Sequence, residues 1–210
     1  DFDRLFSIGN GTSPTNRSNA LTMLKNGNTS IGDDQPGNYK LKIKQSSSYG
    51  LNLENTGTDD WELYVSNSGA NLNLYANASF RGSFDFTTGV YTSISDERLK
   101  TNIQGMGPIL SQVLQLQPKP YTFKEDQKGK KSMGFLAQEV EKIFPELVRK
   151  PESKDPREAY YSLDYTGFGI LAIKAIQEQQ TVIESQQAEL DAQRAVIQEL
   201  LDRVKALEDQ

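Results

Sequence analysis

The 210-residue chain contains no cysteine and no histidine, and these two absences exclude much of active-site chemistry. Without cysteine there are no disulfides, no thiolate nucleophiles and no cysteine-ligated zinc or iron–sulfur centres. Without histidine, one chain cannot form a Ser-His-Asp triad and lacks the usual proton shuttle at neutral pH. Any covalent chemistry therefore needs lysine or a carboxylate as its base.

Apolar residues are also scarce, at 36% of the chain, and the mean hydropathy is −0.62. No apolar run approaches the ~20 residues of a membrane-spanning helix, so we expect no membrane partner. The net charge of −5 disfavours a nucleic-acid partner, because proteins that bind nucleic acids usually present a basic face. So little apolar sequence favours an elongated structure whose core is shared between subunits.

The composition changes sharply near residue 93. Residues 1–95 hold 12 of the 13 asparagines and 10 of the 16 glycines, whereas glutamate, glutamine and lysine dominate residues 96–210. Short alternating segments with an Asn-Gly turn predict strands at 21–24, 29–31, 40–44, 51–53, 61–65 and 72–75. Each strand offers few apolar side chains to one face, so we expect residues 1–93 to form a β-rich trimeric fibre or spike segment.

The second half is predicted to be mixed and then helical. Local patterns indicate short helices at 109–116 and 137–144, strands at 121–123, 133–136 and 160–163, and a polar loop at 149–158. Residues 165–210 contain no proline and read as one helix. The predicted fold class is α+β: an elongated β-rich stalk (1–93), a mixed core (94–164) and a long helix (165–210).

Apolar residues recur every seven positions along this helix. The repeating position holds Ile176, Ile183, Leu190, Ile197 and Val204. The other core position of the heptad holds Gln179, Gln186, Gln193, Leu200 and Leu207. The strict spacing favours an intermolecular coiled coil over a helix packed on its own domain. We expect a coiled coil of three helices, one from each of three chains, because the β-rich half also needs partners. The heptads alone do not distinguish a trimer from a dimer.

One segment near the boundary carries candidate chemistry. Ser95 is a possible hydroxyl nucleophile, and Lys100 follows five residues later, within reach across one turn. A desolvated lysine, or one near other cations, can lose its proton near neutral pH and act as a base without histidine. By spacing alone, the simpler interpretation is a solvated helix start with Ser95 as its N-cap.

Three blocks of sequence, in order, resemble the peptidase S74 family of intramolecular chaperone domains. The residues are SDERLKTNI at 95–103, GFLAQEV at 134–140 with FPELV at 144–148, and LAIKAI at 171–176 with EQQ at 178–180. Such domains lie at the C-termini of phage tailspikes, tail fibres and endosialidases, and on some bacterial surface proteins. The similarity covers about residues 93–185.

The resemblance implies a homotrimeric chaperone that folds the preceding fibre segment and then cuts itself off between Ser95 and Asp96. Ser95 matches the catalytic serine, Lys100 its basic partner, and Asp96 the new N-terminus. The activity would be a single-turnover serine autoproteolysis that needs no cofactor and no metal. The expected location is a virion tail fibre or spike, or a bacterial cell surface.

The nucleophile is left open by the sequence. Attack by Ser95 on its own carbonyl would close a strained four-membered lactone. The hydroxyl of a second chain, a bound water, or the Asp96 carboxylate closing a six-membered ring would avoid that strain. These three routes remain alternatives.

Two other functions compete with self-cleavage. The domain could be a permanent trimerisation cap that never cuts. Alternatively, residues 1–95 could be a fibre tip that binds a host-surface glycan or receptor, with Trp61 and Tyr64 as contact residues, although shared core is the expected role of both. Paired carboxylates at Asp33-Asp34 and Asp59-Asp60, considered for glycosidase or calcium chemistry, are expected to be turns.

Overall fold

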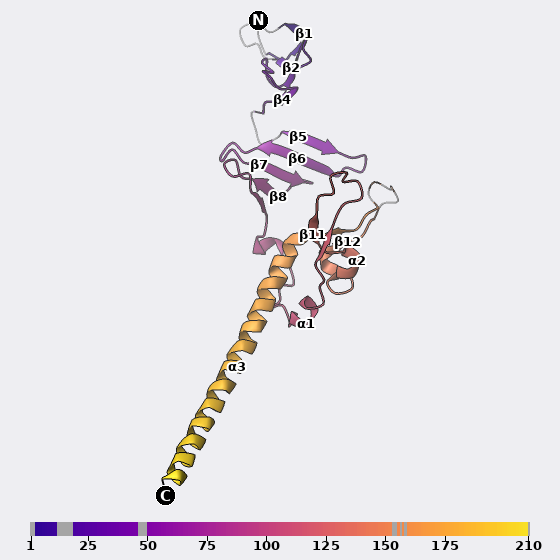
Figure 1. Ribbon diagram of the computed structural model, residues 1–210. Helices are drawn as coiled ribbons and strands as arrows, with labels where there is room; N and C mark the ends of the chain where they lie inside the picture. Colours follow the sequence, from indigo (N-terminus) through magenta and orange to yellow (C-terminus); the bar gives the residue numbers. More distant parts are fainter. Residues whose placement is uncertain are drawn as a thin grey trace. The chain divides into compact units, whose positions relative to one another are not determined.

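The computed structural model describes residues 3–11, 19–45, 50–152, 155, 157 and 159–209. The chain forms two compact units, Asp1–Asn102 and Ile103–Gln210 (Figure 1). The first contains β-sheets, and the second combines short strands with helices, one of which is very long. The predicted α+β class with a long C-terminal helix is therefore confirmed.

The first sheet of the N-terminal unit has a polar interior. Its strands, in the order β1-β2-β3-β4, are β1 (Arg4–Gly9), β2 (Asn19–Leu24), β3 (Thr29–Ile31) and β4 (Leu41–Ile43). Thr22 and Ser30 are fully buried, and the Ser30 hydroxyl donates to the backbone carbonyl of Asp33 at 2.8 Å. Polar groups in the interior are thus hydrogen-bonded rather than replaced by apolar packing.

The second sheet is a five-stranded antiparallel meander. Its strands are β5 (Leu51–Glu54), β6 (Asp60–Val65), β7 (Leu72–Ala76), β8 (Ser79–Phe84) and β9 (Tyr91–Ser93). The register places one set of apolar side chains on a single face, because alternate residues point the same way. This apolar sheet face consists of Leu51, Leu53, Trp61, Leu63, Val65, Leu72, Leu74, Ala76, Phe84 and Tyr91. Seven of these ten side chains are exposed in the single chain.

The C-terminal unit begins with short elements. They are α1 (Leu110–Val113), β10 (Lys119–Tyr121), β11 (Ser132–Gly134), α2 (Ala137–Val140), a 3₁₀ turn η2 (Pro145–Leu147), β12 (Val148–Arg149) and β13 (Ser162–Leu163). Strand β10 pairs with β11, and β12 pairs with β13, both antiparallel. These small hairpins are held by a common core. Its buried members are Ile109, Val140, Phe144, Leu147 and Leu171.

Gly134 and Phe135 pack against the first turn of the long helix. A Cβ atom on Gly134 would lie 2.4 Å from the Tyr165 hydroxyl oxygen, so only glycine fits here without moving Tyr165. The backbone N–H of Phe135 donates to the same hydroxyl at 3.2 Å. The Phe135 ring stacks on Phe168, with centroids 4.7 Å apart.

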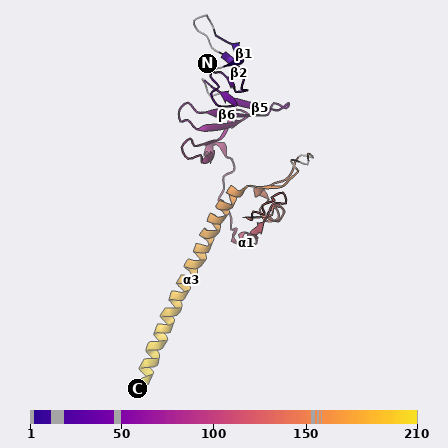
Figure 2. The same ribbon diagram turned by 45° about the horizontal axis from the view of Figure 1, so that its top comes forward.

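Helix α3 (Tyr165–Glu208) begins where the sequence predicts. The Asp164 carboxylate caps it by accepting the backbone N–H of Thr166 at 2.9 Å. Its buried residues, Gly167, Leu171 and Ala175, all lie in the first three turns. The remainder projects beyond the other elements of its unit (Figures 1 and 2). At ~1.5 Å per residue, the 44 residues span roughly 66 Å.

Several predicted boundaries differ from the structure. Strand β10 runs from Lys119 to Tyr121 rather than over 121–123, because its register is set by pairing with β11. Pro120 is accommodated since β10 is an edge strand, which tolerates a missing N–H donor. Strands β1, β8, β9 and β12 were not predicted, and both short helices are shorter than expected.

Candidate functional site

Ser95 lies two residues after β9, the edge strand of the second sheet. Its pairing with β8 continues past the strand, because the Ile94 N–H donates to the Arg81 carbonyl at 3.2 Å. Gly82 allows this close approach: its φ is +153°, and a Cβ atom there would lie 2.4 Å from the Thr92 carbonyl oxygen. The chain is therefore held in place up to the residue before Ser95.

A 3₁₀ turn, η1 (Glu97–Leu99), then brings the chain back toward Ser95. The cap of this turn is Asp96, whose carboxylate accepts the Arg98 N–H at 2.8 Å. The Lys100 N–H donates to the Glu97 carbonyl at 2.9 Å and closes the turn. The five-residue separation of Ser95 and Lys100 thus corresponds to one tight turn, capped by Asp96 and not by Ser95.

The Lys100 side chain contacts Ser95 at two atoms. Its Nζ lies 2.7 Å from Ser95 Oγ and 3.2 Å from the Ser95 carbonyl oxygen. That carbonyl belongs to the 95–96 peptide bond. A lysine in this position can exchange a proton with the hydroxyl and can also polarise the carbonyl. Both side chains are exposed in the single chain.

The Asp96 carboxylate is engaged by Arg98. Arg98 Nε donates to Oδ1 at 3.0 Å, and Nη2 donates to Oδ2 at 2.7 Å, which makes a two-pronged ion pair. These bonds, the Arg98 backbone N–H and the nearby Lys100 charge hold the pKa of Asp96 below its usual value. The carboxylate is therefore ionised at neutral pH and directed at Arg98.

An open depression of about 560 Å³ surrounds these residues. Its lining consists of Ser79, Phe80, Arg81, Ile94, Ser95, Asp96, Leu99 and Lys100. The sequence did not indicate the three residues from β8, since they belong to no motif and lie at least 14 positions before Ser95. Only the β8–β9 pairing brings them to the site.

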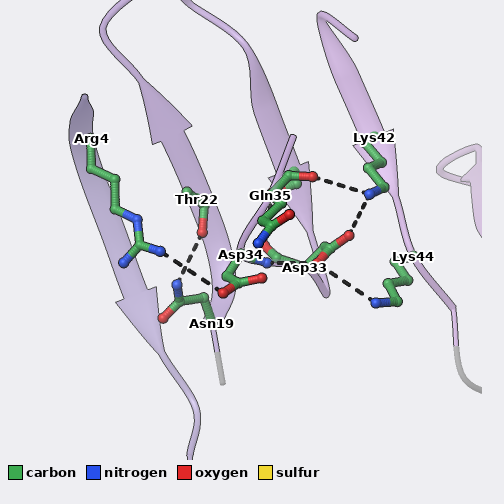
Figure 3. Close-up of polar contacts among 9 residues, drawn as sticks. Arg4, Asn19, Thr22, Asp33, Asp34, Gln35, Lys42 and Lys44 are labelled. Carbon is green, nitrogen blue, oxygen red and sulfur yellow. Dashed lines mark hydrogen bonds and ion pairs between the residues drawn. The ribbon is translucent and has the colours of Figure 1, made fainter. Parts of the chain in front are cut away.

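The acidic pairs in the first half have structural partners. The Asp33 carboxylate, almost fully buried, lies 2.5 Å from Lys42 Nζ and 3.7 Å from Lys44 Nζ (Figure 3). The Lys42 hydrogen bond is the main reason that the pKa of Asp33 falls to about 2, against the cost of burial. Asp60 receives hydrogen bonds from Asn52 and from the Asn77 backbone at 2.6 and 2.8 Å.

No group of three or more acidic side chains converges as a metal site within the ranges that the structure describes. Across the same part of the chain, no helix combines the length and apolar content needed to span a membrane.

The comparison with protein families identifies the class of this segment. Residues 95–149 match the Peptidase_S74 family, described as "Chaperone of endosialidase". The resemblance predicted from the sequence is thus confirmed for this segment, which begins at Ser95 and includes Lys100.

A comparison with individual proteins finds a phage relative. The chain is 34% identical over 99 residues to a protein of Escherichia phage Phieco32 described as "Probable tail fiber protein". The aligned region is 46% of this chain and 14% of the relative, so the chain spans a small part of the relative's length.

Proposed function

We propose that this chain is part of a phage tail fibre and carries its own cleavable folding chaperone. Residues 94–164 and helix 165–210 would assemble three copies of the β-rich segment 1–93. Hydrolysis of the Ser95–Asp96 bond would then release residues 96–210. One observation carries the proposal: Lys100 Nζ contacts both the Ser95 hydroxyl and the carbonyl of that bond, in a segment that matches a chaperone family.

Lys100 is suited to two tasks in this hydrolysis. As an ammonium it donates to the Ser95 carbonyl oxygen, where negative charge grows as a nucleophile attacks. As a neutral amine it accepts the proton of the attacking hydroxyl or water. The bond between the Ser95 carbonyl carbon and the Asp96 nitrogen breaks. A water oxygen ends on the carbon, and the nitrogen takes the proton relayed by Lys100.

The geometry favours two of the three possible nucleophiles. The Asp96 carboxylate is bound by Arg98 at two oxygens, so ring closure by Asp96 would first have to break that ion pair. Attack by Ser95 of a second chain, or by a water that Ser95 and Lys100 orient, needs no such rupture. In the first route an ester between two chains forms and is then hydrolysed.

The apolar sheet face supports assembly of the N-terminal unit from several copies. Five strands present leucine, valine and aromatic side chains on one side, and most of these are exposed in the single chain. Contiguous apolar surface of this kind marks a protein interface. Trp61 lies on this face among aliphatic residues, which favours a packing role over a sugar-contacting one.

The exposed stripe of α3 supports the same arrangement for the C-terminal unit. The heptad residues from Ile176 (62% exposed) to Val204 (50% exposed) follow the last buried residue of the helix, Ala175. A long helix with an exposed apolar stripe is stabilised in water when partner helices cover the stripe, and a parallel coiled coil provides that cover. Three copies are proposed because both the β-rich half and the helix need partners and the family resemblance implies a homotrimer.

Assembly followed by cleavage has a clear physical purpose. Strand pairing between three chains is slow and exposes sheet edges that aggregate. A coiled coil joins the chain ends and raises their local concentration, which speeds the pairing. Cleavage then removes the helix, so the folded fibre is retained by its unfolding barrier and not by an equilibrium with its nucleus.

Mass spectrometry of the full chain and three variants tests the cleavage. The wild type should give fragments of 95 and 115 residues, the lengths on either side of the Ser95–Asp96 bond. Ser95→Ala and Lys100→Ala should remain intact. Lys100→Arg keeps the cation but cannot act as a base at neutral pH, so it should also remain intact. A single full-length species for the wild type would instead support a permanent trimerisation cap.

Native mass spectrometry tests the trimer in the uncleavable Ser95→Ala background. Ile183→Asp places a charge in the proposed seam and should abolish trimers. Ala188→Asp, five residues further on and exposed on the opposite side of the heptad, is the matched control and should leave them intact. Equal trimer content in both variants would refute the coiled coil.

A further inference from the structure

The Glu178 side chain of helix α3 hydrogen-bonds to the backbone at residues 109–110, which follow the proposed cleavage segment 95–100. The Glu178 carboxylate accepts the backbone N–H of Ile109 through Oε1 and that of Leu110 through Oε2, each at 2.9 Å. These contacts join residues 68 and 69 positions apart in the sequence. Two other glutamates of the helix, Glu184 and Glu189, bond only to glutamine side chains one turn away.

The Glu178 contact is well formed and largely shielded. Its side chain is 19% exposed, and Lys174 Nζ lies 3.7 Å away on the preceding turn. The two backbone donors, with Lys174, hold the pKa of Glu178 below its usual value, so the carboxylate is charged at neutral pH. Hydrogen bonds to an ionised acceptor are stronger than neutral ones. Ile109 is itself buried in the core, which fixes the other end of the contact.

The position of this contact along the chain links two parts of the proposed mechanism. Glu178 is two residues beyond Ile176, where the exposed heptad stripe begins. Ile109 is nine residues after Lys100, and the connecting residues 101–108 contain no helix or strand. The same carboxylate therefore ties the start of the coiled-coil stripe to the chain that leads out of the cleavage site.

We infer that Glu178 is a positioning residue that couples assembly of helix α3 to cleavage, an inference that rests on the proposed function. With the contact made, residue 109 is anchored on the helix, and the eight residues back to Lys100 have one fixed end. Without it, this segment gains conformational freedom, and the Lys100 amine samples the Ser95 carbonyl less often. Glu178 touches no reacting atom.

Glu178→Gln in the full chain tests this coupling, with Glu199→Gln as a matched control. Glu199 occupies the same heptad position three repeats later, and its side chain makes no hydrogen bond or ion pair with any residue that the structure describes. Trimer content is measured by native mass spectrometry, and the rate of cleavage in the trimer by intact mass. Hydrogen exchange at Ile109 and Leu110 reports the contact itself.

The expected result is that Glu178→Gln forms trimers, exchanges faster at Ile109 and Leu110, and cleaves at least about tenfold more slowly. Glu199→Gln should match the wild type in all three measurements. Wild-type cleavage in the Glu178→Gln trimer would overturn the inference and leave the proposed function standing. Loss of trimers in Glu178→Gln would also overturn it, since the residue would then serve assembly alone. Absence of cleavage in the wild type would overturn the proposed function instead.

Discussion

Gly167 and Gly169 offer a matched test of how α3 packs on the C-terminal unit. Both lie in the first turns of the helix, both have ordinary helical backbones, and only one faces the core. A Cβ atom on Gly167 would lie 2.2 Å from Leu147 Cδ2, whereas one on Gly169 would meet nothing within 4 Å. Alanine at the two positions therefore changes helix propensity equally and packing unequally.

The sizes of these effects follow from the local structure. Replacing a helical glycine by alanine stabilises a helix by about 1 kcal/mol, and this term is common to both variants. Leu147 is buried, and its backbone carbonyl accepts the Asp164 N–H at 2.9 Å, so its side chain must rotate within a packed core. Overpacking of this kind costs about 1–3 kcal/mol. Gly169→Ala should be more stable than Gly167→Ala by that amount.

Urea unfolding followed by circular dichroism measures the difference. Both variants are made in the Ser95→Ala background, which the proposed mechanism makes uncleavable. They are compared at one protein concentration, because the proposed assembly would make stability depend on concentration. Gly169→Ala should unfold at higher urea than the Ser95→Ala parent, and Gly167→Ala at lower or similar urea. If Gly167→Ala is at least as stable as Gly169→Ala, the packing of Gly167 on Leu147 is wrong.

Three further predictions concern the N-terminal unit. Because the folded pKa of Asp33 lies near 2, below its ordinary 3.8, its roughly 2 kcal/mol of stability is present above about pH 4 and lost toward pH 2. Thermal unfolding across this range should show a larger loss of stability in the parent than in Asp33→Asn, which keeps the other carboxylates. Gly82→Ala should push β9 off β8 at Thr92 and slow cleavage, whereas unchanged kinetics by intact mass would contradict the placement of Ser95 by that strand. Arg98→Ala should raise the pKa of Asp96 without speeding cleavage, and faster cleavage would instead identify the Asp96 carboxylate as the nucleophile.

The sequence was sufficient where local patterns agree with the final environment. Helix α3 was predictable because its sequence has heptad spacing and no proline, and both can be recognised without a partner. The segment 95–100 was recognisable from its motif. The short strands were less well predicted, since a three-residue strand such as β10 takes its limits from the strand it pairs with.

The backbone turn and the side-chain directions within residues 95–100 were not predicted from the sequence alone. Spacing placed Lys100 within reach of Ser95, but the contact with both Ser95 oxygens depends on the η1 turn and on the Asp96 cap. The ion pair that turns the Asp96 carboxylate toward Arg98 was likewise not predicted.

The sequence by itself determined the absence of histidine and cysteine chemistry, the helical C-terminus and the identity of the Ser95–Lys100 pair, because each depends on residue type or local spacing. Only the tertiary structure decided that β8 lies beside the segment proposed to be cleaved and that Glu178 binds the backbone at residue 109. Both contacts join residues distant in sequence, and no local pattern encodes which backbone group a carboxylate or a strand edge will meet after folding.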